Sequence, residues 1–161
     1  MRVTHLRSEQ IKEAEALIDG YPEIFSKTDT LNYRKDLKAQ QNDPTSHFLV
    51  LNSDKELVGI IGYKKDENSH NSYNVDWLII KKGHEHQGLG SQLMTEVENH
   101  VRKEGGRHIY LETSAVRHNQ QAKDFYKHLG FIQVGLLPDY FDHPKKKYQK
   151  LEDAALYHKS I

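Results

Sequence analysis

The sequence contains no cysteine. This absence excludes disulfide bonds, thiolate nucleophiles and zinc sites built on cysteine ligands. It also contains no apolar run near the roughly 20 residues that a membrane-spanning helix needs. The first residues, MRVTHLR, are charged, whereas a signal peptide has an apolar segment there. We therefore expect a cytoplasmic protein with no membrane partner.

An excess of charge of either sign is also missing. Lys and Arg number 23, Asp and Glu number 23, and the formal net charge is +0. Nothing global therefore favours binding to a nucleic-acid backbone or an anionic membrane, and we expect neither partner. A chain of 161 residues is long enough to bury one sizeable core. Its length predicts a single domain over residues 1–161.

Histidine, in contrast, is abundant, with 11 residues. Metal ligation is one interpretation, but the chain has no His-Glu-x-x-His sequence and no His-x-x-x-His pair on a predicted helix. His84 and His86 lie two residues apart in a predicted turn, which is a poor ligand geometry. We expect no metal site, and interpret the histidines as polar surface residues.

The spacing of apolar residues predicts the element order β-α-α-β-β-β-α-β-α-β-β. Early hairpin strands and a late strand–helix–strand unit predict an α/β fold (α+β mixed sheet), a central mixed β-sheet flanked by helices. The predicted helices cover residues 9–18, 30–41, 89–103 and 119–129, and the predicted strands residues 2–7, 47–51, 56–64, 73–81, 108–113, 131–136 and 153–158.

A glycine-containing turn stands between one predicted strand and the following helix. An apolar run over residues 75–80 leads into a polar turn that ends in Gly88-Leu89-Gly90. A helix N-terminus presents free N–H groups and the positive end of its dipole. Glycines there are expected to let a ligand approach the backbone, so the stretch predicts a phosphate cradle. The dinucleotide fingerprint is incomplete because position 93 is Leu, and the P-loop ending Gly-Lys-Ser/Thr is absent.

A second pattern, Asn119-x-x-Ala122-x-x-Phe125-Tyr126-x-x-x-Gly130-Phe131, lies on the helix after the next strand. Together the two stretches resemble the GNAT superfamily of N-acetyltransferases. Its cofactor motif is Arg/Gln-x-x-Gly-x-Gly/Ala, and its later motif is Asn-x-x-Ala-x-x-x-Tyr-x-x-x-Gly-Phe. The resemblance covers roughly residues 45–160. Residues 151–157 also resemble the closing strand of small bacterial members, including ribosomal-protein N-terminal acetyltransferases.

The chain departs from the family pattern at three places. Glu85 stands where Arg or Gln is usual, and Lys82 stands where proline is common. A carboxylate beside a pyrophosphate is repulsive if it points inward, so we expect Glu85 to point away. The spacing from Glu112 to Asn119 is two residues longer than in the ribosomal-protein enzymes, which puts the transfer of their catalytic base onto Glu112 in doubt.

The resemblance implies that acetyl-CoA is the cosubstrate and that no metal is needed. Transfer in such a family is direct, within a ternary complex. Without cysteine, an acetyl-enzyme is not expected. Backbone groups would hold the pyrophosphate and the pantetheine amides, and a free N–H would stabilise the oxyanion of the acetyl carbonyl. The implied cofactor-binding residues are Leu78, Ile79, Ile80, His86, Gln87, Gly88, Leu89, Gly90, Ser91, Asn119 and Tyr126.

The resemblance also suggests catalytic roles. Tyr126 would protonate the leaving thiolate as a general acid, and the alternative is an ordinary core tyrosine. Asn119 would bond the pantetheine arm, cap its helix, or do both. Glu112 is a candidate base and Asp76 is another. For Asp76 a structural, hydrogen-bonded role is the favoured alternative, and a water chain without a dedicated base is also open.

The implied acceptor is a primary amine, either a small molecule or the N-terminus of a peptide or protein. Its site would be built by the first two helices and the loops at 66–72 and 137–147, with Tyr140 and Phe141 as candidate wall residues. A non-catalytic acyl-CoA-binding or regulatory module on the same fold is the main alternative. A nucleotide-binding regulator is a second. The oligomeric state is open, with a homodimer as one alternative.

Overall fold

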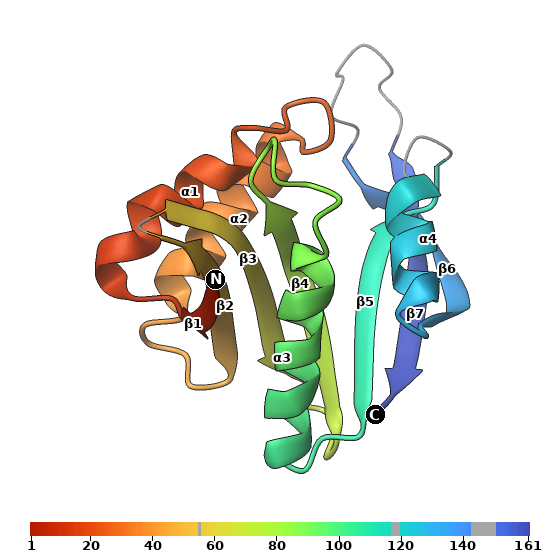
Figure 1. The fold of residues 1–161 in the computed structure, drawn as a ribbon. Helices are drawn as coiled ribbons and strands as arrows, with labels where there is room; N and C mark the ends of the chain where they lie inside the picture. Colours follow the sequence, from red (N-terminus) through yellow and green to blue (C-terminus); the bar gives the residue numbers. More distant parts are fainter. Residues whose placement is uncertain (55, 117–119, 143–150) are drawn as a thin grey trace.

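The structure is a computed structural model that describes residues 1–54, 56–116, 120–142 and 151–161 (Figure 1). Over these residues the predicted order of strands and helices is confirmed. The elements are β1 (Arg2–His5), the 3₁₀ helix η1 (Ser8–Gln10), α1 (Ile11–Ile18), α2 (Lys27–Ala39), β2 (Ser46–Ser53), β3 (Glu56–Lys65), β4 (Ser72–Ile80), α3 (Leu89–Lys103), β5 (His108–Ser114), α4 (Gln120–His128), β6 (Ile132–Phe141) and β7 (Glu152–Ser160).

Two element boundaries differ from the sequence-based expectation by three or more residues. Helix α2 begins at Lys27, earlier than predicted, because Ser26 caps it: its Oγ accepts from Asp29 N at 3.1 Å and its own N–H donates to the Asp29 carboxylate at 2.8 Å. Strand β6 continues to Phe141, so Tyr140 and Phe141 lie on a strand rather than in the predicted loop. Among the described residues, none of the helices combines the length and apolar character that crossing a membrane requires.

The strands form one mixed sheet in the order β1-β2-β3-β4-β5-β7-β6. Strands β4 and β5 pair in parallel, and every other neighbouring pair is antiparallel. A parallel pair needs a crossover connection, and α3 supplies it. The mixed sheet with flanking helices confirms the predicted fold class (Figure 1).

Each face of the sheet has its own hydrophobic core because side chains alternate along a strand. On one face, α1 and α2 pack on β2, β3 and the end of β4. On the other face, α3 covers the centre of the sheet, and Tyr126 of α4 packs at the edge of that core. The central residues of the α3-side core are Leu49, Val58, Ile61, Leu93, Met94, Val97, Val101, Leu111 and Tyr157.

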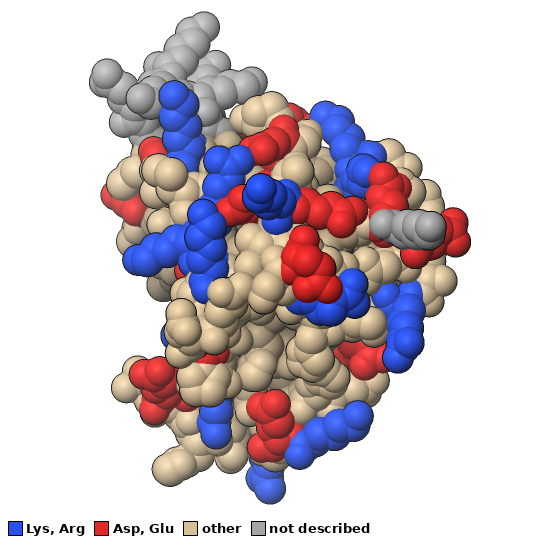
Figure 2. Space-filling view, turned by 90° about the vertical axis from the view of Figure 1, so that its left-hand side faces the viewer, with Lys and Arg blue, Asp and Glu red and all other residues tan. Residues whose placement is uncertain are grey.

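Charged side chains are mixed over the surface. Figure 2 shows Lys and Arg interspersed with Asp and Glu over the face that it displays, without a broad area of one sign. This distribution agrees with the zero formal net charge.

Two histidine groups lie at the end of the sheet away from the glycine turn. The rings of His5 and His100 stack at 5.2 Å, and His108 Nδ1 lies 3.0 Å from His158 Nε2. Burial, followed by the charge of the neighbouring His5, lowers the pKa of His100. Burial, followed by the charge of the neighbouring His108, lowers the pKa of His158.

We expect these histidines to make stability pH-dependent. The unfolded chain binds their protons near the ordinary pKa of 6.5, whereas the folded protein resists protonation. Their contribution is therefore complete above pH 6.5 and is lost as the pH falls through the lowered folded values. The melting temperature should fall less on acidification in His100→Gln than in the unmodified protein, with the exposed His70→Gln as control. Equal acid sensitivity of all three proteins would refute this assignment.

Candidate functional site

Strands β4 and β5 separate at their carboxyl ends. Their last paired residues are Val75 and Leu111, although β4 continues to Ile80 and β5 to Ser114. Figure 1 shows the two strands moving apart toward their carboxyl ends. Backbone groups of β4 that face β5 beyond Val75 therefore have no partner in β5. The stretch that contains Leu78, Ile79 and Ile80 is therefore separated from β5.

A bulge in β4 lies at the start of this separation. Tyr63 of β3 pairs with Val75 and Gly62 pairs with Trp77, so Asp76 has no partner in β3. A bulge re-aims side chains and increases local twist. Here it changes which residues face α3: Tyr73 and Val75 belong to the α3-side core before it, and Leu78 and Ile80 after it.

The turn after β4 has an unusual backbone. Gly83, His86 and Gly88 have φ of 90°, 62° and 77°. A left-handed conformation is costly for a side-chain-bearing residue such as His86 and tends to persist at functional sites. Left-handed residues alternating with right-handed ones turn successive N–H groups toward one concavity, which suits an anion. Gly88 is the N-cap of α3, so this concavity adjoins a helix N-terminus.

The N–H groups of residues 86–91 are available to a ligand. Within the described part of the chain, none of them donates a hydrogen bond, whereas neighbouring amides do: His84 N donates to Lys81 O, and Gln92 N to Gly88 O. The helix leaves its first N–H groups free by geometry. The free groups belong to His86, Gln87, Gly88, Leu89, Gly90 and Ser91, which are the residues predicted from the sequence.

Glycine at position 90 has a packing role that the motif does not reveal. A Cβ there would lie 3.1 Å from Phe125 Cζ and 3.8 Å from Leu78 Cδ2. Gly90 therefore permits close packing of α3 against α4 and β4. Gly88 is the position at which the backbone needs glycine, because of its positive φ.

Glu85 is held by two hydrogen bonds. Its Oε1 accepts from the Tyr21 hydroxyl at 2.7 Å and its Oε2 accepts from Gly83 N at 2.6 Å. The bond from Tyr21 lowers the pKa of Glu85 most, followed by backbone bonds. The carboxylate is therefore charged at neutral pH. Its two partners, the Tyr21 hydroxyl and Gly83 N, are not among the free amides of residues 86–91.

Tyr126 lies on α4 with its ring against the α3-side core. Its ring centroid is 6.0 Å from that of Phe131 and 6.2 Å from that of Tyr157. Tyr126 packs on the core, as an ordinary core tyrosine would, but it is only half-buried, as a general acid needs to be. The structure is therefore compatible with both interpretations of this residue. Burial raises the pKa of its hydroxyl to about 12, so the group is protonated at neutral pH.

Glu112 and Asp76 flank the mouth of the separation. Each directly follows the last β4–β5 pair on its own strand. Leu111 packs in the α3-side core, so Glu112 points to the opposite face. Asp76 is exposed at the mouth, where partial desolvation, followed by the charges of Asp36 and Glu112, raises its pKa to about 6. Burial also raises the pKa of Glu112.

The side chain of Asp76 forms no hydrogen bond within the described residues, which weighs against the structural role favoured for it. Asp36, whose charge acts on Asp76, is fixed on α2 by the Trp77 indole, whose Nε1 donates to Asp36 Oδ2 at 2.9 Å. The surroundings of Asp76 are therefore set by α2 and β5 together.

The end of β6 faces the same mouth. Burial and then the charges of Glu112 and Asp76 raise the pKa of Tyr140, so its hydroxyl lies within their field. The Thr28 hydroxyl at the start of α2 donates to Asp142 at 3.0 Å. The start of α2 and the residue that follows β6 are therefore in contact. The 66–72 loop, also expected to contribute to the acceptor site, instead leads into the start of β4, at the end of that strand opposite the mouth.

Several predicted parts cannot be placed. Asn119 and residues 143–147 of the predicted acceptor loop lie outside the described residues. Within the described ranges, no cluster of three or more His, Asp or Glu side chains has a geometry that could hold a metal ion.

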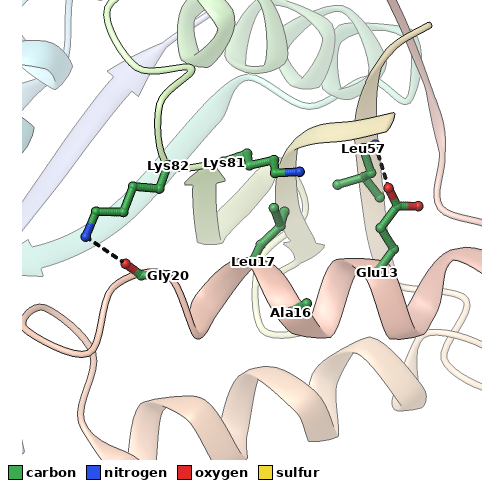
Figure 3. A pocket seen from close by; sticks show the side chains of 7 residues that line it. All are labelled: Glu13, Ala16, Leu17, Gly20, Leu57, Lys81 and Lys82. Atoms are coloured by element: carbon green, nitrogen blue, oxygen red, sulfur yellow. Dashed lines mark hydrogen bonds between the residues drawn. The ribbon is translucent and has the colours of Figure 1, made fainter. Parts of the chain in front are cut away.

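A separate pocket lies beside α1 and does not belong to this site. It is lined by Glu13, Ala16, Leu17, Gly20, Leu57, Lys81 and Lys82 (Figure 3). Both of its lysines already have partners, because Lys81 pairs with Glu56, and Lys82 donates to Gly20 O and lies 3.7 Å from Glu23. It contains none of the free amides and neither carboxylate of the β4–β5 mouth.

Sequence reasoning missed Tyr21 and Asp36. Tyr21 lies 64 positions from Glu85 and Asp36 lies 41 positions from Trp77, so no local motif marks them. The unusual Glu85 was the only available signal, because a carboxylate at an anion-binding turn requires a partner.

Comparison with known proteins agrees with this geometry. The sequence matches the model of the Acetyltransferase (GNAT) family over residues 13–131. A protein of Lactobacillus delbrueckii subsp. lactis, described as an uncharacterized N-acetyltransferase in the pepI 3′ region, is 29% identical over 122 residues, which are 71% of this chain and 69% of that protein.

Solved structures share the fold at low identity. A protein of Desulfovibrio desulfuricans assigned to the GNAT family aligns with a TM-score of 0.84 at 20% identity, covering 99% of this chain and 98% of its own. A ribosomal-protein-alanine N-acetyltransferase of Brucella melitensis aligns with a TM-score of 0.80 at 16% identity over 100% of both chains. An aminoglycoside 6′-N-acetyltransferase complexed with coenzyme A aligns with a TM-score of 0.72 at 18% identity, covering 99% of this chain and 97% of its own.

Proposed function

The chain belongs to the GNAT acetyltransferase family, and on that premise we propose that it transfers the acetyl group of acetyl-CoA to a primary amine at the β4–β5 mouth. One observation carries the proposal: the free N–H groups of residues 86–91 directly follow the strand that separates from β5. An elongated ligand with a pyrophosphate and an amide-containing arm fits both features at once.

The free amides of His86 to Ser91 would bind the pyrophosphate. In the stretch of Leu78, Ile79 and Ile80, the backbone groups that face β5 and have no partner there would bind the pantetheine amides. Hydrogen bonds from backbone N–H groups to an anion are charge-assisted and roughly twice as strong as neutral ones. Asn119 stays a predicted contact of the same arm. The acetyl group would then lie between Tyr126 on one face of the sheet and the two carboxylates on the other.

The chemistry needs one proton acceptor and one donor. As the amine nitrogen bonds to the acetyl carbonyl carbon, the carbon–sulfur bond breaks and its electron pair leaves with sulfur. We assign the role of proton acceptor to Asp76, because a pKa of about 6 is close to the operating pH and suits a base. Glu112, the base favoured from the sequence, would stand beside it and keep that pKa raised.

Tyr126 would donate its hydroxyl hydrogen to the departing sulfur. With a pKa of about 12 the hydroxyl is protonated throughout the physiological range. A free thiol has a pKa of about 8.5, so complete proton transfer is uphill in the ligand-free site. The main effect of Tyr126 is therefore a hydrogen bond to the charge that develops on sulfur, which stabilises the transition state.

The acceptor would enter from the face that carries Asp76, Glu112 and Tyr140. The two carboxylates there would attract a protonated amine, and Asp76 would accept its proton. The fold relatives named for ribosomal-protein alanine and for aminoglycosides both act on amines, which supports an amine acceptor as a class. We propose a small-molecule or peptide amine and direct transfer in a ternary complex.

Binding of CoA should stabilise the fold. At a concentration near 100 times its Kd, a ligand that binds only the native state adds about 2.7 kcal/mol to the free energy of unfolding. A thermal melt with CoA should therefore shift upward, whereas NAD and ATP, which lack the pantetheine arm, should shift it little. No shift at millimolar CoA, or a larger shift with NAD or ATP, would overturn the proposal.

A further inference from the structure

We propose that Tyr21 is a positioning residue for cofactor binding: it holds the Glu85 carboxylate away from the free amides of residues 86–91. The inference rests on the proposed function, because it assumes that these amides bind the pyrophosphate. It explains how the turn can contain a carboxylate at a position where the family motif has Arg or Gln.

The contacts fix Glu85 at both oxygens. The Tyr21 hydroxyl is 2.7 Å from Glu85 Oε1 and 2.7 Å from Ile80 O, so its single proton is shared between the turn and the end of β4. Gly83 N donates to the second oxygen at 2.6 Å. The Tyr21 hydroxyl therefore joins the loop between α1 and α2 to the cofactor turn and to the end of β4.

Tyr21 is itself firmly placed. Its N–H donates to Ile18 O at 3.0 Å at the end of α1, and its carbonyl accepts from Ile24 and Phe25 N, each at 3.0 Å. Lys82 lies over its ring, 5.7 Å from the centroid, and donates to Gly20 O at 3.2 Å (Figure 3). A rigid loop can hold a carboxylate in one orientation at low entropic cost.

Glu85 needs such a partner because of its charge. It directly precedes the free amides in the sequence, and its pKa is lowered, so it is ionised whenever the cofactor binds. A carboxylate free to rotate would either occupy the amides itself or repel the incoming pyrophosphate. With both oxygens engaged, the side chain does neither.

The experiment compares CoA affinity in four proteins by calorimetry: unmodified, Tyr21→Phe, Glu85→Gln and the double variant. Losing one hydrogen bond of ordinary strength should weaken CoA binding about three- to tenfold in Tyr21→Phe. Glu85→Gln alone should bind nearly as the unmodified protein does. Adding Glu85→Gln to Tyr21→Phe should restore affinity, because the released side chain is then neutral.

The double variant separates charge control from a merely structural role. Both proteins that carry Tyr21→Phe lose the bond to Ile80 O, so any effect of that loss or of a loosened loop is common to them. If affinity stays equally low in both, the proposed role of Tyr21 is wrong. Unchanged affinity in Tyr21→Phe would also overturn it. Raising the ionic strength should reduce the Tyr21→Phe defect, since salt screens repulsion between exposed charges.

Tyr33→Phe is the matched control. Tyr33 lies on α2, and its hydroxyl donates to Ala14 O at 2.8 Å without contacting the cofactor turn. Its loss should lower the melting temperature and leave CoA affinity unchanged. If the unmodified protein does not bind CoA, the proposed function itself fails, and the role of Tyr21 falls with it. That result is distinct from an intact affinity in Tyr21→Phe.

Discussion

Replacing Tyr126 with Phe is expected to lower kcat by about 10²- to 10⁴-fold, the usual range for removing a general acid or proton donor. The hydroxyl contributes only while charge develops on sulfur, so its loss should leave CoA affinity almost unchanged. The ring and its contacts with Phe131 and Tyr157 survive in the variant. Steady-state kinetics together with calorimetric CoA binding give both quantities.

Tyr157→Phe is the control for this substitution. Tyr157 is fully buried, and its hydroxyl has no hydrogen-bond partner among the described residues. Removing an unsatisfied buried hydroxyl should be neutral or stabilising. Turnover should therefore be retained in Tyr157→Phe and lost in Tyr126→Phe, although both lose the same atom from neighbouring rings. Full activity in Tyr126→Phe would make Tyr126 a core residue only.

The second large effect is expected at the two carboxylates of the β4–β5 mouth. If Asp76 accepts the amine proton, Asp76→Asn should lower kcat/KM by about 10²- to 10⁴-fold near neutral pH. In the unmodified protein, kcat/KM should rise with pH through about 6, where Asp76 loses its proton and becomes a base. The variant should lose this acidic limb of the profile.

Glu112→Gln should behave differently. Its negative charge is one of the causes that raise the pKa of Asp76, so neutralising it should move the acidic limb to lower pH and reduce kcat/KM only moderately. Asp36→Asn should shift the limb in the same direction, because the Asp36 charge acts on Asp76 in the same sense. If Glu112→Gln abolished the acidic limb of the kcat/KM profile and Asp76→Asn only shifted it, Glu112 would be the proton acceptor and Asp76 the neighbouring charge. The two carboxylates would then still titrate as a coupled pair.

Features encoded by contiguous residues could be predicted from the sequence. The strand, the Gly88-Leu89-Gly90 turn and the apolar face of α3 are local, and so is the pattern around Tyr126. From these local features the element order and the free amides at the start of α3 could be predicted. The capping role of Ser26 is also local, but it was overlooked, which displaced the predicted start of α2.

Features that depend on distant residues could not be predicted. Gly90 is small because Phe125 of α4 packs against it, a contact invisible in the motif itself. Tyr140 shares the field of Asp76 and Glu112 only because β6 continues past its predicted end. The pKa of Asp76 depends on Asp36, which Trp77 fixes from another helix. Such properties arise from tertiary packing rather than from sequence pattern.

The central claim is tested most directly by measuring thiol release from acetyl-CoA alongside acetylated product. The panel should contain peptides with free N-termini, the same peptides already blocked at the N-terminus, and an aminoglycoside. The account predicts that at least one primary amine stimulates thiol release and yields acetylated amine in equal amount, whereas its blocked counterpart does not. Tight CoA binding without amine-dependent thiol release from any acceptor would contradict the account and favour a non-catalytic acyl-CoA-binding module.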